Sequence, residues 1–488
     1  MRAINVAFFI NYSLCLAFIL NMIFISKKKP ERIIAWTIAL MIPFLGVAIY
    51  ILIGAGLSRF TKRMIKKYEL SSKQYEANIK KQINVLQNND DLKSYPTEYK
   101  DIILLNLNNA NSIFSRNNDL KFFLDGPSVF NNLKKDIKNA KSTIHLQFYI
   151  FSNDKTGKEL IKLLTEKAQK GVEVRVLYDA IGSLHTHKHA FKKLIKAGGK
   201  VSVFFPPFLN IRFLNLNANY RNHRKICVID GKIAYTGGFN IRDDHMGKVK
   251  RLAPWRDTSI RIYGGSVHSL QNIFLSDWRF ATKDSTEPSE YNNGKYFPDI
   301  KSQTIKQNSS VQVITSGPYA VSEQIKHCMI KMMMNAKKSI KIQTPYFIPD
   351  DSFIEALKLA VLSGVEVELM FPKKVDHWHV HYASIGYLNA LIQSGIKIYL
   401  YDGFIHSKVL FVDDNVLTTG SCNIDIRSFS LNFEDNVVIY DENLVKKYAN
   451  YFEKDKKRCE IYTEQMKKRR NIFKKILIKF CRLFSAIL

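Results

Sequence analysis

Two stretches of the chain carry the same order of residues that could act on a phosphate ester. Each reads H-x-K-x4-D, and in each an asparagine follows the histidine by the same interval. An imidazole can attack phosphorus or carry a proton near neutral pH, and an ammonium group can hold a phosphoryl oxygen. Two copies let one histidine attack while the other protonates the leaving oxygen, so we expect no metal ion or other cofactor. The repeated positions are His223, Lys225, Asp230 and Asn240 in the first copy and His406, Lys408, Asp413 and Asn423 in the second.

The local sequence predicts that histidine and lysine share one face of a strand. From Lys225 to Asp230 the residues fit a two-residue alternation, which is the period of a β-strand. His223 and Lys225 then project on the same side. One such motif alone would be explained by a histidine and a lysine on an exposed edge strand, but its repetition in register favours an active site.

The two motifs resemble those of the phospholipase D superfamily, whose members form one active site from both copies. The resemblance implies a catalytic role for the motif residues, and phosphate binding by the two lysines and the two asparagines. It also implies an acidic residue that orients each histidine, Asp257 for the first motif and Glu434 for the second. Because Asp230 and Asp413 lie at the far end of the motif, we expect them to hold a loop rather than touch the substrate.

Segments around the motifs also occur twice. An Asn-Ala-Lys sequence that leads into an apolar strand begins at Asn139 and at Asn335, and a Gly-Val-Glu-Val strand begins at Gly171 and at Gly364. Strands alternate with helices in both halves, which is typical of an α/β fold. We predict two similar phospholipase D-like domains with mostly parallel sheets, related by a pseudo-two-fold axis. The expected ranges are 95–281 for the first domain, 282–310 for a linker and 311–465 for the second domain.

Two apolar runs near the amino terminus, residues 3–25 and 33–57, are each long enough to cross a bilayer. A cleaved signal peptide would explain the first run, but no small-residue cleavage site follows it, and a basic loop leads directly into the second run. We expect a two-helix transmembrane hairpin over residues 1–57, followed by a solvated linker arm at 58–94. Lysine and arginine are slightly more numerous outside the hairpin loop than in it. The positive-inside rule then places the catalytic domains in the cytoplasm.

The chain is strongly basic, with a net charge of +30. Such an excess favours a polyanionic partner, either nucleic acid or an anionic membrane surface. In the tail, residues 466–488, basic and apolar residues can be sorted onto two faces of a helix. This pattern fits a helix in the membrane interface and, equally well, an amphipathic helix docked on the second domain. The six cysteines show no spacing typical of a disulfide framework or a zinc site.

Two other groups of residues could bear on the chemistry. Three alternate histidines follow Asp376, a set that could bind a metal, although a loop that lines the pocket is the favoured interpretation. Several aromatic residues could exclude water from a reactive intermediate, and core packing explains them equally well. These aromatic residues are Phe208, Phe213, Tyr346 and Phe347.

Nearly the whole chain is similar to bacterial cardiolipin synthases. The similar segments are the basic loop at 27–32, Gly238–Ile241, Trp255–Thr258, Gln343–Asp350 and Asp425–Phe429. The resemblance implies that two phosphatidylglycerol molecules are joined into cardiolipin, with release of glycerol, through a phosphohistidine that we place on His223. The implied partners are phosphatidylglycerol and anionic lipids of the cell membrane, with no nucleic acid. A phospholipase or a membrane-tethered nuclease would use the same motifs, and a lipid-binding scaffold would need no catalysis. The sequence leaves the oligomeric state open.

Overall fold

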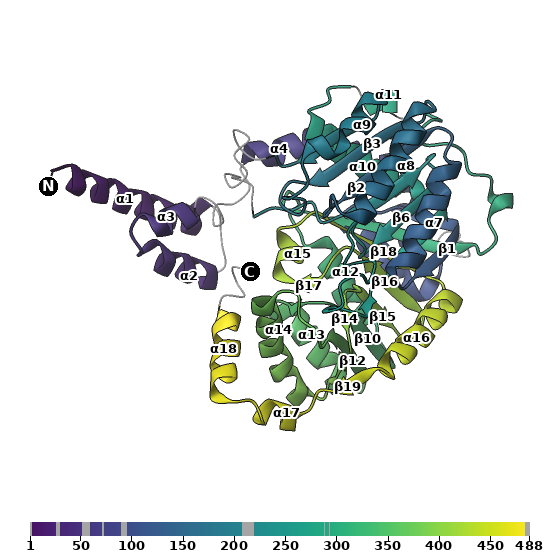
Figure 1. Cartoon of the computed structure of the whole chain (residues 1–488). Coiled ribbons are helices and arrows are strands. Elements are labelled where there is room, and N and C mark those ends of the chain that lie inside the picture. Colours follow the sequence, from purple (N-terminus) through teal and green to yellow (C-terminus); the bar gives the residue numbers. More distant parts are fainter. Residues whose placement is uncertain are drawn as a thin grey trace.

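The structure, a computed structural model, describes residues 2–25, 30–50, 59–70, 73–88, 95–206, 219–286, 288–291 and 293–483. Two similar halves form one body, with the first half, in blue and teal, above the second, in green and yellow (Figure 1). A single sheet of fifteen strands runs through both halves. The chain is therefore duplicated in space as it is in sequence.

The first half contributes seven strands to the sheet. They are β1 (Phe114–Phe123), β2 (Thr143–Phe148), β3 (Glu173–Asp179), β4 (Lys200–Phe204), β5 (Lys225–Ile229), β6 (Ile233–Gly237) and β8 (Ser259–Gly264). Their order is β1-β8-β6-β5-β2-β3-β4. The helices α7 (Gly126–Asn139), α8 (Lys155–Gln169) and α9 (Lys192–Lys196) pack on one face, and α10 (Val267–Thr282) packs on the other.

The second half repeats this order and adds one edge strand. Its strands are β9 (Ser309–Ser316), β10 (Ser339–Gln343), β12 (Glu366–Pro372), β13 (Lys397–Tyr401), β15 (Val409–Val412), β16 (Val416–Gly420), β18 (Glu434–Ile439) and β19 (Cys459–Ile461). The order is β9-β18-β16-β15-β10-β12-β13-β19, and β1 pairs with β9 to join the halves. The main helices are α12 (Gln324–Met334), α13 (Asp351–Leu362), α14 (Trp378–Leu391) and α16 (Glu442–Lys456).

The sheet is mixed, so the prediction of mostly parallel sheets is wrong. Only β2-β3-β4 and β10-β12-β13 run parallel within it, whereas its remaining pairs are antiparallel. The reason lies in the turns after the two motifs. Asp230 and Gly231 have positive φ values of 51° and 61°, and Asp413 and Asp414 have 54° and 55°. Such turns form tight hairpins, which reverse the chain and make the next strand antiparallel.

Alternate residues of each motif strand face two different cores. On β5, Cys227 and Ile229 pack against α7 and α8, whereas Ile226 and Val228 enter a core shared by both halves. Val409 and Phe411 of β15 enter the same shared core. The halves therefore pack face to face around the motif strands, which brings the two motifs together.

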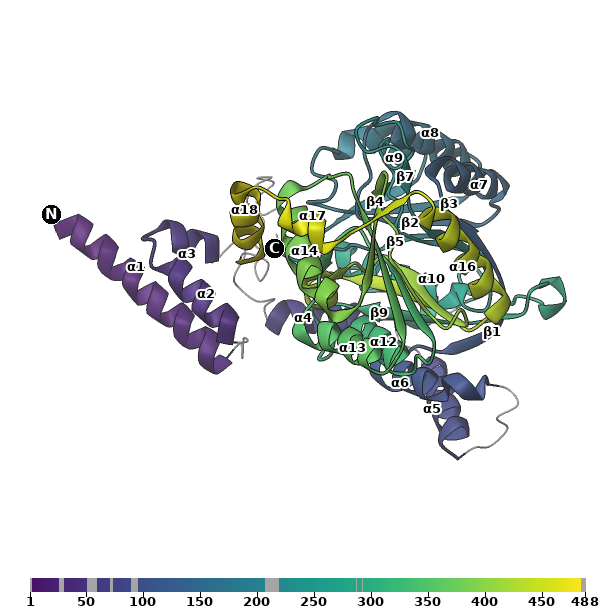
Figure 2. The same ribbon diagram turned by 90° about the horizontal axis from the view of Figure 1, so that it is seen from below.

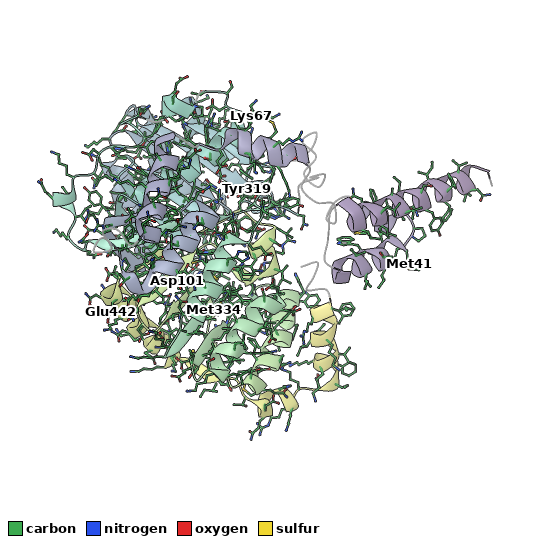
Figure 3. All side chains as sticks on the ribbon, turned by 180° about the vertical axis from the view of Figure 1, so that it is seen from behind. Met41, Lys67, Asp101, Tyr319, Met334 and Glu442 are labelled. Carbon is green, nitrogen blue, oxygen red and sulfur yellow. The ribbon has the colours of Figure 1, made fainter. Side chains whose placement is uncertain are left out.

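The arm after the hairpin is packed on the body, and in this respect the expectation of a solvated linker is wrong. It contains α4 (Arg59–Tyr68) and α5 (Lys73–Asn88), which leads to α6 (Lys100–Ala110). Ile65 of α4 is buried beside α10, and Ile79 and Leu86 of α5 are buried against α6 and α12. The helix α4, which carries the exposed Lys67, lies on the body, whereas Met41 lies on the separate amino-terminal unit (Figure 3).

The amino-terminal unit contains α1 (Arg2–Leu20), α2 (Pro30–Leu40) and α3 (Leu45–Ile49). One described helix, Ile4–Ile23, is long and apolar enough to cross a membrane. The second expected span is interrupted between α2 and α3, around Pro43, and residues 51–57 of that span lie outside the described residues. Two continuous spans are thus an expectation from sequence.

The tail folds as α17 (Glu464–Lys468) and α18 (Ile472–Leu483), and α18 lies along α14 on the side of the body nearest α1 (Figure 2). Ile478 and Cys481 are buried at that contact. Ile472, Phe473 and Leu483 are exposed. The tail helix is docked on the second half, as one of the two sequence interpretations expected, and it also keeps an apolar surface in solvent.

Candidate active site

Each catalytic histidine is held by backbone of the opposite half. The short strand β14 (Phe404–Ile405) pairs with β7 (Trp255–Arg256), and the N–H of His406 donates to the carbonyl of Arg256 over 2.6 Å. In the same way, the N–H of His223 donates to the carbonyl of Phe433 over 2.9 Å. Since Arg256 precedes Asp257 and Phe433 precedes Glu434, this exchange places the acid of one half beside the histidine of the other.

His223 and Glu434 form the first pair. Nδ1 of His223 lies 2.9 Å from Oε2 of Glu434, and the carboxylate also accepts hydrogen bonds from Ser421 Oγ (2.5 Å) and Asn432 Nδ2 (3.2 Å). Both members of the pair are buried. Burial lowers the pKa of His223 to about 4, with Glu434 opposing that shift and Lys225 adding to it. The unbound imidazole is therefore neutral near pH 7 and can keep Nε2 free as a nucleophile.

His406 and Asp257 form the second pair. Nδ1 of His406 lies 2.7 Å from Oδ2 of Asp257, whose other oxygen accepts the N–H of Thr258 over 2.7 Å. Burial and the two motif lysines lower the pKa of His406. The close approach of Asp257 needs a glycine at 238, because a Cβ there would lie 1.9 Å from Oδ1 of Asp257.

The pairing within each half that we expected is wrong. Asp257 follows the first motif in sequence but contacts the histidine of the second, and Glu434 contacts the histidine of the first. The reason is the exchange of short strands between the halves, which a repeat within the sequence does not reveal. Both histidine pairs depend on both halves.

The two motif lysines are buried cations without a carboxylate partner. Lys225 and Lys408 are each 2% exposed, and Nζ of each donates to the carbonyl of the motif histidine over 2.6 Å. Neither forms an ion pair with a carboxylate among the described residues. Burial lowers the pKa of Lys225 to about 7 and that of Lys408 to about 8. An anion that enters between them would offset this cost of burial.

Both histidines line one cavity of about 800 Å³. The two motif asparagines line it as well. Oδ1 of Asn240 accepts the N–H of Ile150 over 3.1 Å, and Oδ1 of Asn423 is buried without a hydrogen-bond partner among the described residues. The histidines and asparagines of both motifs thus line one space, and each buried lysine is bonded to the carbonyl oxygen of its motif histidine.

The motif aspartates have a different place. The carboxylate of Asp230 accepts the backbone N–H groups of Lys141, Ser142 and Thr143 over 2.7 to 2.9 Å, at the entry to β2. Asp413 accepts the corresponding N–H groups at the entry to β10. The two aspartates therefore hold loops and do not line the cavity. Their position at the far end of each motif led us to expect this role.

His245 is a third histidine at the site. Its ring lies 5.0 Å from that of His406 and 4.2 Å from that of Trp255, and its Nδ1 accepts the N–H of Asn240 over 3.2 Å. The second half has Ser428 at the corresponding position, so the duplication gave no signal for this residue. Sequence reasoning also missed Tyr149, whose ring packs edge-on against His223 at 4.7 Å.

One group of side chains at the site has the geometry of a metal site. Ligand atoms of His245, Asp257 and His406 lie within 4.8 Å of one another. However, Asp257 already accepts a hydrogen bond from His406, and the charges of Lys225 and Lys408 act on the same side chains. Two buried cations beside the group disfavour a third.

The aspartate and histidines at 376–381 lie at the cavity wall. Asp376, His377 and His379 line it, and the hydroxyl of Tyr346 donates to Asp376. Of the other aromatic residues expected there, Phe347 is buried in the core of the second half, and Phe208 and Phe213 lie outside the described residues.

Comparisons with known proteins agree with this geometry. Residues 133–278 and 329–456 match the family described as "Cardiolipin synthase, PLD-like domain". The cardiolipin synthase of Clostridium perfringens is 39% identical over 95% of this chain and 96% of that protein. The chain belongs to the cardiolipin synthase family. The major cardiolipin synthase of Bacillus subtilis is 41% identical over 97% of this chain and 98% of that protein.

A solved structure shows the same fold. Phosphatidylserine synthase from Haemophilus influenzae superposes with a TM-score of 0.58 over 76% of this chain and 95% of that one, at 17% identity. The prediction of phospholipase D superfamily membership is confirmed, and the cardiolipin synthase family accounts for nearly the full length of the chain.

Proposed function

We propose that the chain is a phosphatidyltransferase that joins two phosphatidylglycerol molecules into cardiolipin and releases glycerol. The observation that carries this proposal is the pair of carboxylate-bound histidines that line one cavity, each with a buried lysine bonded to its carbonyl oxygen. The full-length similarity to cardiolipin synthases supports the choice of substrate. Because the phosphodiester lost from one molecule is formed again in the product, the reaction needs no nucleotide.

The donor phosphodiester would bind between Lys225 and Lys408. Nε2 of His223 attacks phosphorus and the bond from phosphorus to the glycerol oxygen breaks, while His406 gives its proton to that oxygen. Glu434 stabilises the positive charge on the phosphorylated imidazole. The lysines and the asparagines Asn240 and Asn423 neutralise charge on the phosphoryl oxygens.

The second step reverses the roles. His406 takes the proton of a headgroup hydroxyl of the second phosphatidylglycerol, the hydroxyl oxygen attacks phosphorus, and the bond from phosphorus to His223 breaks. Asp257 holds the imidazole of His406 in place and stabilises its charged form. The negative charge of the bound phosphodiester raises the pKa of His406, which offsets the lowering by burial and lysine charges in the unoccupied site.

The finer membrane arrangement is part of this proposal. Residues 1–57 form a two-span hairpin in the cell membrane, with the catalytic halves in the cytoplasm, as the apolar runs and the distribution of lysine and arginine favour. The apolar unit of α1, α2 and α3 supports an anchor of this kind. Anionic lipids of the same membrane are then both the surface and the substrate.

The tail helix α18 would rest on that surface. Its exposed apolar residues Ile472, Phe473, Ile476 and Leu483 lie on one sector, and the sector beyond the α14 contact carries Lys475 and Lys479. Apolar residues directed into the acyl region and lysines at anionic headgroups are the features of an interfacial helix. Since α18 packs on α14, whose first turn lines the cavity, the bilayer would meet the body near the cavity.

Hydrogen exchange of the full chain in lipid nanodiscs tests this contact. Residues 472–483 should exchange more slowly in nanodiscs with phosphatidylglycerol than with phosphatidylcholine alone, and the substitutions Phe473→Ser and Ile476→Ser should remove the difference. Equal exchange in both lipids would contradict the contact.

The products formed from phosphatidylglycerol micelles by the purified chain, with a chelator present, test the proposed reaction. We expect cardiolipin and glycerol from the unmodified chain, and neither from His223→Ala or His406→Ala. Phosphatidic acid as the sole product would identify a phospholipase. Cleavage of DNA without any lipid product would identify a nuclease.

A further inference from the structure

Two arginines that line the catalytic cavity lie close enough for the charge of one to act on the other. Arg221 comes from the segment before the first motif and Arg427 from α15 (Ile426–Ser430), and both line the cavity. The guanidinium of Arg427 is held by Asn219, whose Oδ1 and carbonyl oxygen accept hydrogen bonds over 2.8 Å each. Arg221 donates to the carbonyl of Tyr220 over 3.3 Å. One residue of each half thus contributes a cation to the same wall.

The charge of this pair is not neutralised by an ion pair with any described carboxylate. The nearest acids are engaged by backbone: Asp179 accepts the N–H groups of Ile181, Gly182 and Asn222, and Asp425 accepts that of Ser428. Burial lowers the pKa of Arg427 and the charge of Arg221 lowers it further, whereas the charge of Asp425 opposes the shift. The charges of Asp179 and Asp425 offset part of this repulsion, and an anion bound by both guanidiniums would stabilise the pair further.

The pair lies near Tyr149, a residue that also contacts His223 and has Nζ of Lys225 over its ring at 5.4 Å. The ring of Tyr149 packs on His223 at 4.7 Å, and the charges of Arg221 and Arg427 both oppose the rise that burial causes in the pKa of the Tyr149 hydroxyl. Tyr149 is therefore a neighbour of both His223 and the arginine pair. A second phosphate could bind there while the first is attached to His223.

The proposed reaction needs such a second anion site. Cardiolipin carries two phosphodiesters joined through one glycerol, so the acceptor brings a phosphate of its own next to the phosphatidyl-histidine. Lys225 and Lys408 are already occupied by the first phosphate in the proposed mechanism. Water and free glycerol carry no phosphate and would gain nothing from a second site.

We propose that Arg221 and Arg427 bind the phosphodiester of the acceptor phosphatidylglycerol and so select a phosphate-bearing acceptor over water and glycerol. This inference rests on the proposed transferase function. A bidentate guanidinium contact with phosphate fixes orientation as well as charge, which would direct the acceptor hydroxyl toward phosphorus. The site sets which alcohol receives the phosphatidyl group.

The test separates acceptor binding from the first chemical step. Phosphatidyl-p-nitrophenol serves as the donor, because it has no glycerol headgroup that could accept and its nitrophenolate leaves without a proton. Short-chain phosphatidylglycerol and glycerol are compared as acceptors. The variants are Arg221→Gln and Arg427→Gln, with Arg427→Lys as the conservative change and the exposed Arg116→Gln as the control.

Each glutamine variant should raise the KM for phosphatidylglycerol by about tenfold to a hundredfold, since it loses charged hydrogen bonds. It should leave the kcat/KM for glycerol and the initial release of nitrophenolate unchanged, and yield more phosphatidic acid. Arg427→Lys should lie between, and Arg116→Gln should match the unmodified chain. An equal loss with both acceptors, or no loss with either, would overturn the proposal.

Two further outcomes distinguish failure of the proposed function from failure of the acceptor-site assignment. If the unmodified chain makes no cardiolipin from phosphatidylglycerol, the proposed function fails, whatever the arginine variants do. Inorganic phosphate, added at constant ionic strength, should not accelerate transfer to glycerol. If it does so only while both arginines are present, the pair is a site for free phosphate and the assignment to the acceptor lipid is wrong.

Discussion

Nδ1 of His223 lies 2.9 Å from the carboxylate of Glu434, a residue 211 positions further along the chain. The reciprocal contact joins His406 to Asp257 at 2.7 Å. Neither half of the molecule can therefore form a carboxylate–histidine pair by itself. The duplication has produced a single site that depends on both copies.

This exchange predicts which step each acid supports. Glu434→Gln should slow the initial release of nitrophenolate from phosphatidyl-p-nitrophenol by about a hundredfold to ten-thousandfold, because the charge that stabilises the His223 imidazolium is lost. Asp257→Asn should leave that release unchanged and slow the later transfer. Rapid-mixing kinetics with both variants measure the two phases. The opposite assignment of the phases would mean that each acid serves the histidine of its own half.

The motif aspartates are predicted to affect stability rather than chemistry. Asp230→Ala removes an acceptor shared by three backbone N–H groups, which should lower the free energy of unfolding by about 1 to 3 kcal/mol. The kcat of the folded fraction should stay within a few-fold of the unmodified value. Thermal unfolding in detergent and activity per folded chain measure the two effects, with the exposed Asp299→Ala as the control. A large loss of kcat at unchanged stability would give Asp230 a direct catalytic role.

Stability should also fall in mild acid because His223 is buried as the neutral form. Its folded pKa is about 4, below the usual unfolded value of about 6.5, so between these pH values the unfolded chain binds more protons. Stability is fully present above pH 6.5 and declines as the pH falls, by about 2 kcal/mol at pH 5 for this residue. The difference in unfolding midpoint between pH 7 and pH 5 should be smaller in His223→Asn. An equal or larger difference in the variant would show that His223 is not held neutral.

The absence of a side chain at Gly238 is predicted to set the position of Asp257. In Gly238→Ala the new methyl group would occupy the place of Oδ1 of Asp257, so the carboxylate must move away from His406. We expect a loss of at least about tenfold in the transfer step, with a cost to stability of about 1 to 3 kcal/mol. Gly294→Ala, where no atom lies within 4 Å of the new group, is the matched control. Full transfer activity in Gly238→Ala would mean that the position of Asp257 is not critical.

The sequence allowed the duplication, the motif residues and the pairing of two motifs in one site to be predicted, because these follow from a repeat that can be read in register. The direction of the strands could also have been recognised. Asp230–Gly231 between two apolar strands is a hairpin signal, and it favours an antiparallel pair. Elsewhere in each half strands alternate with helices, a pattern typical of a parallel sheet, and it outweighed this hairpin signal.

Neither the pairing of each histidine with the acid of the other half nor the arginine pair could be predicted from the sequence. Each depends on contacts across the two halves: the His223–Phe433 backbone bond sets one, and the approach of Arg427 to Arg221 sets the other. A repeat shows that two segments are alike, but it does not show which half supplies the contacting residue for each histidine. His245 was missed because it has no counterpart in the second half.

The central claim is that His223 carries the phosphatidyl group while His406 transfers the protons. The most direct measurement is the initial release of nitrophenolate from phosphatidyl-p-nitrophenol by the variants His223→Ala and His406→Ala. Because this leaving group needs no proton, His406→Ala should release about one equivalent per chain and then stop, with the phosphatidyl group bound to His223 in the intact mass. His223→Ala should release none. A burst from His223→Ala, or from neither variant, would contradict the account.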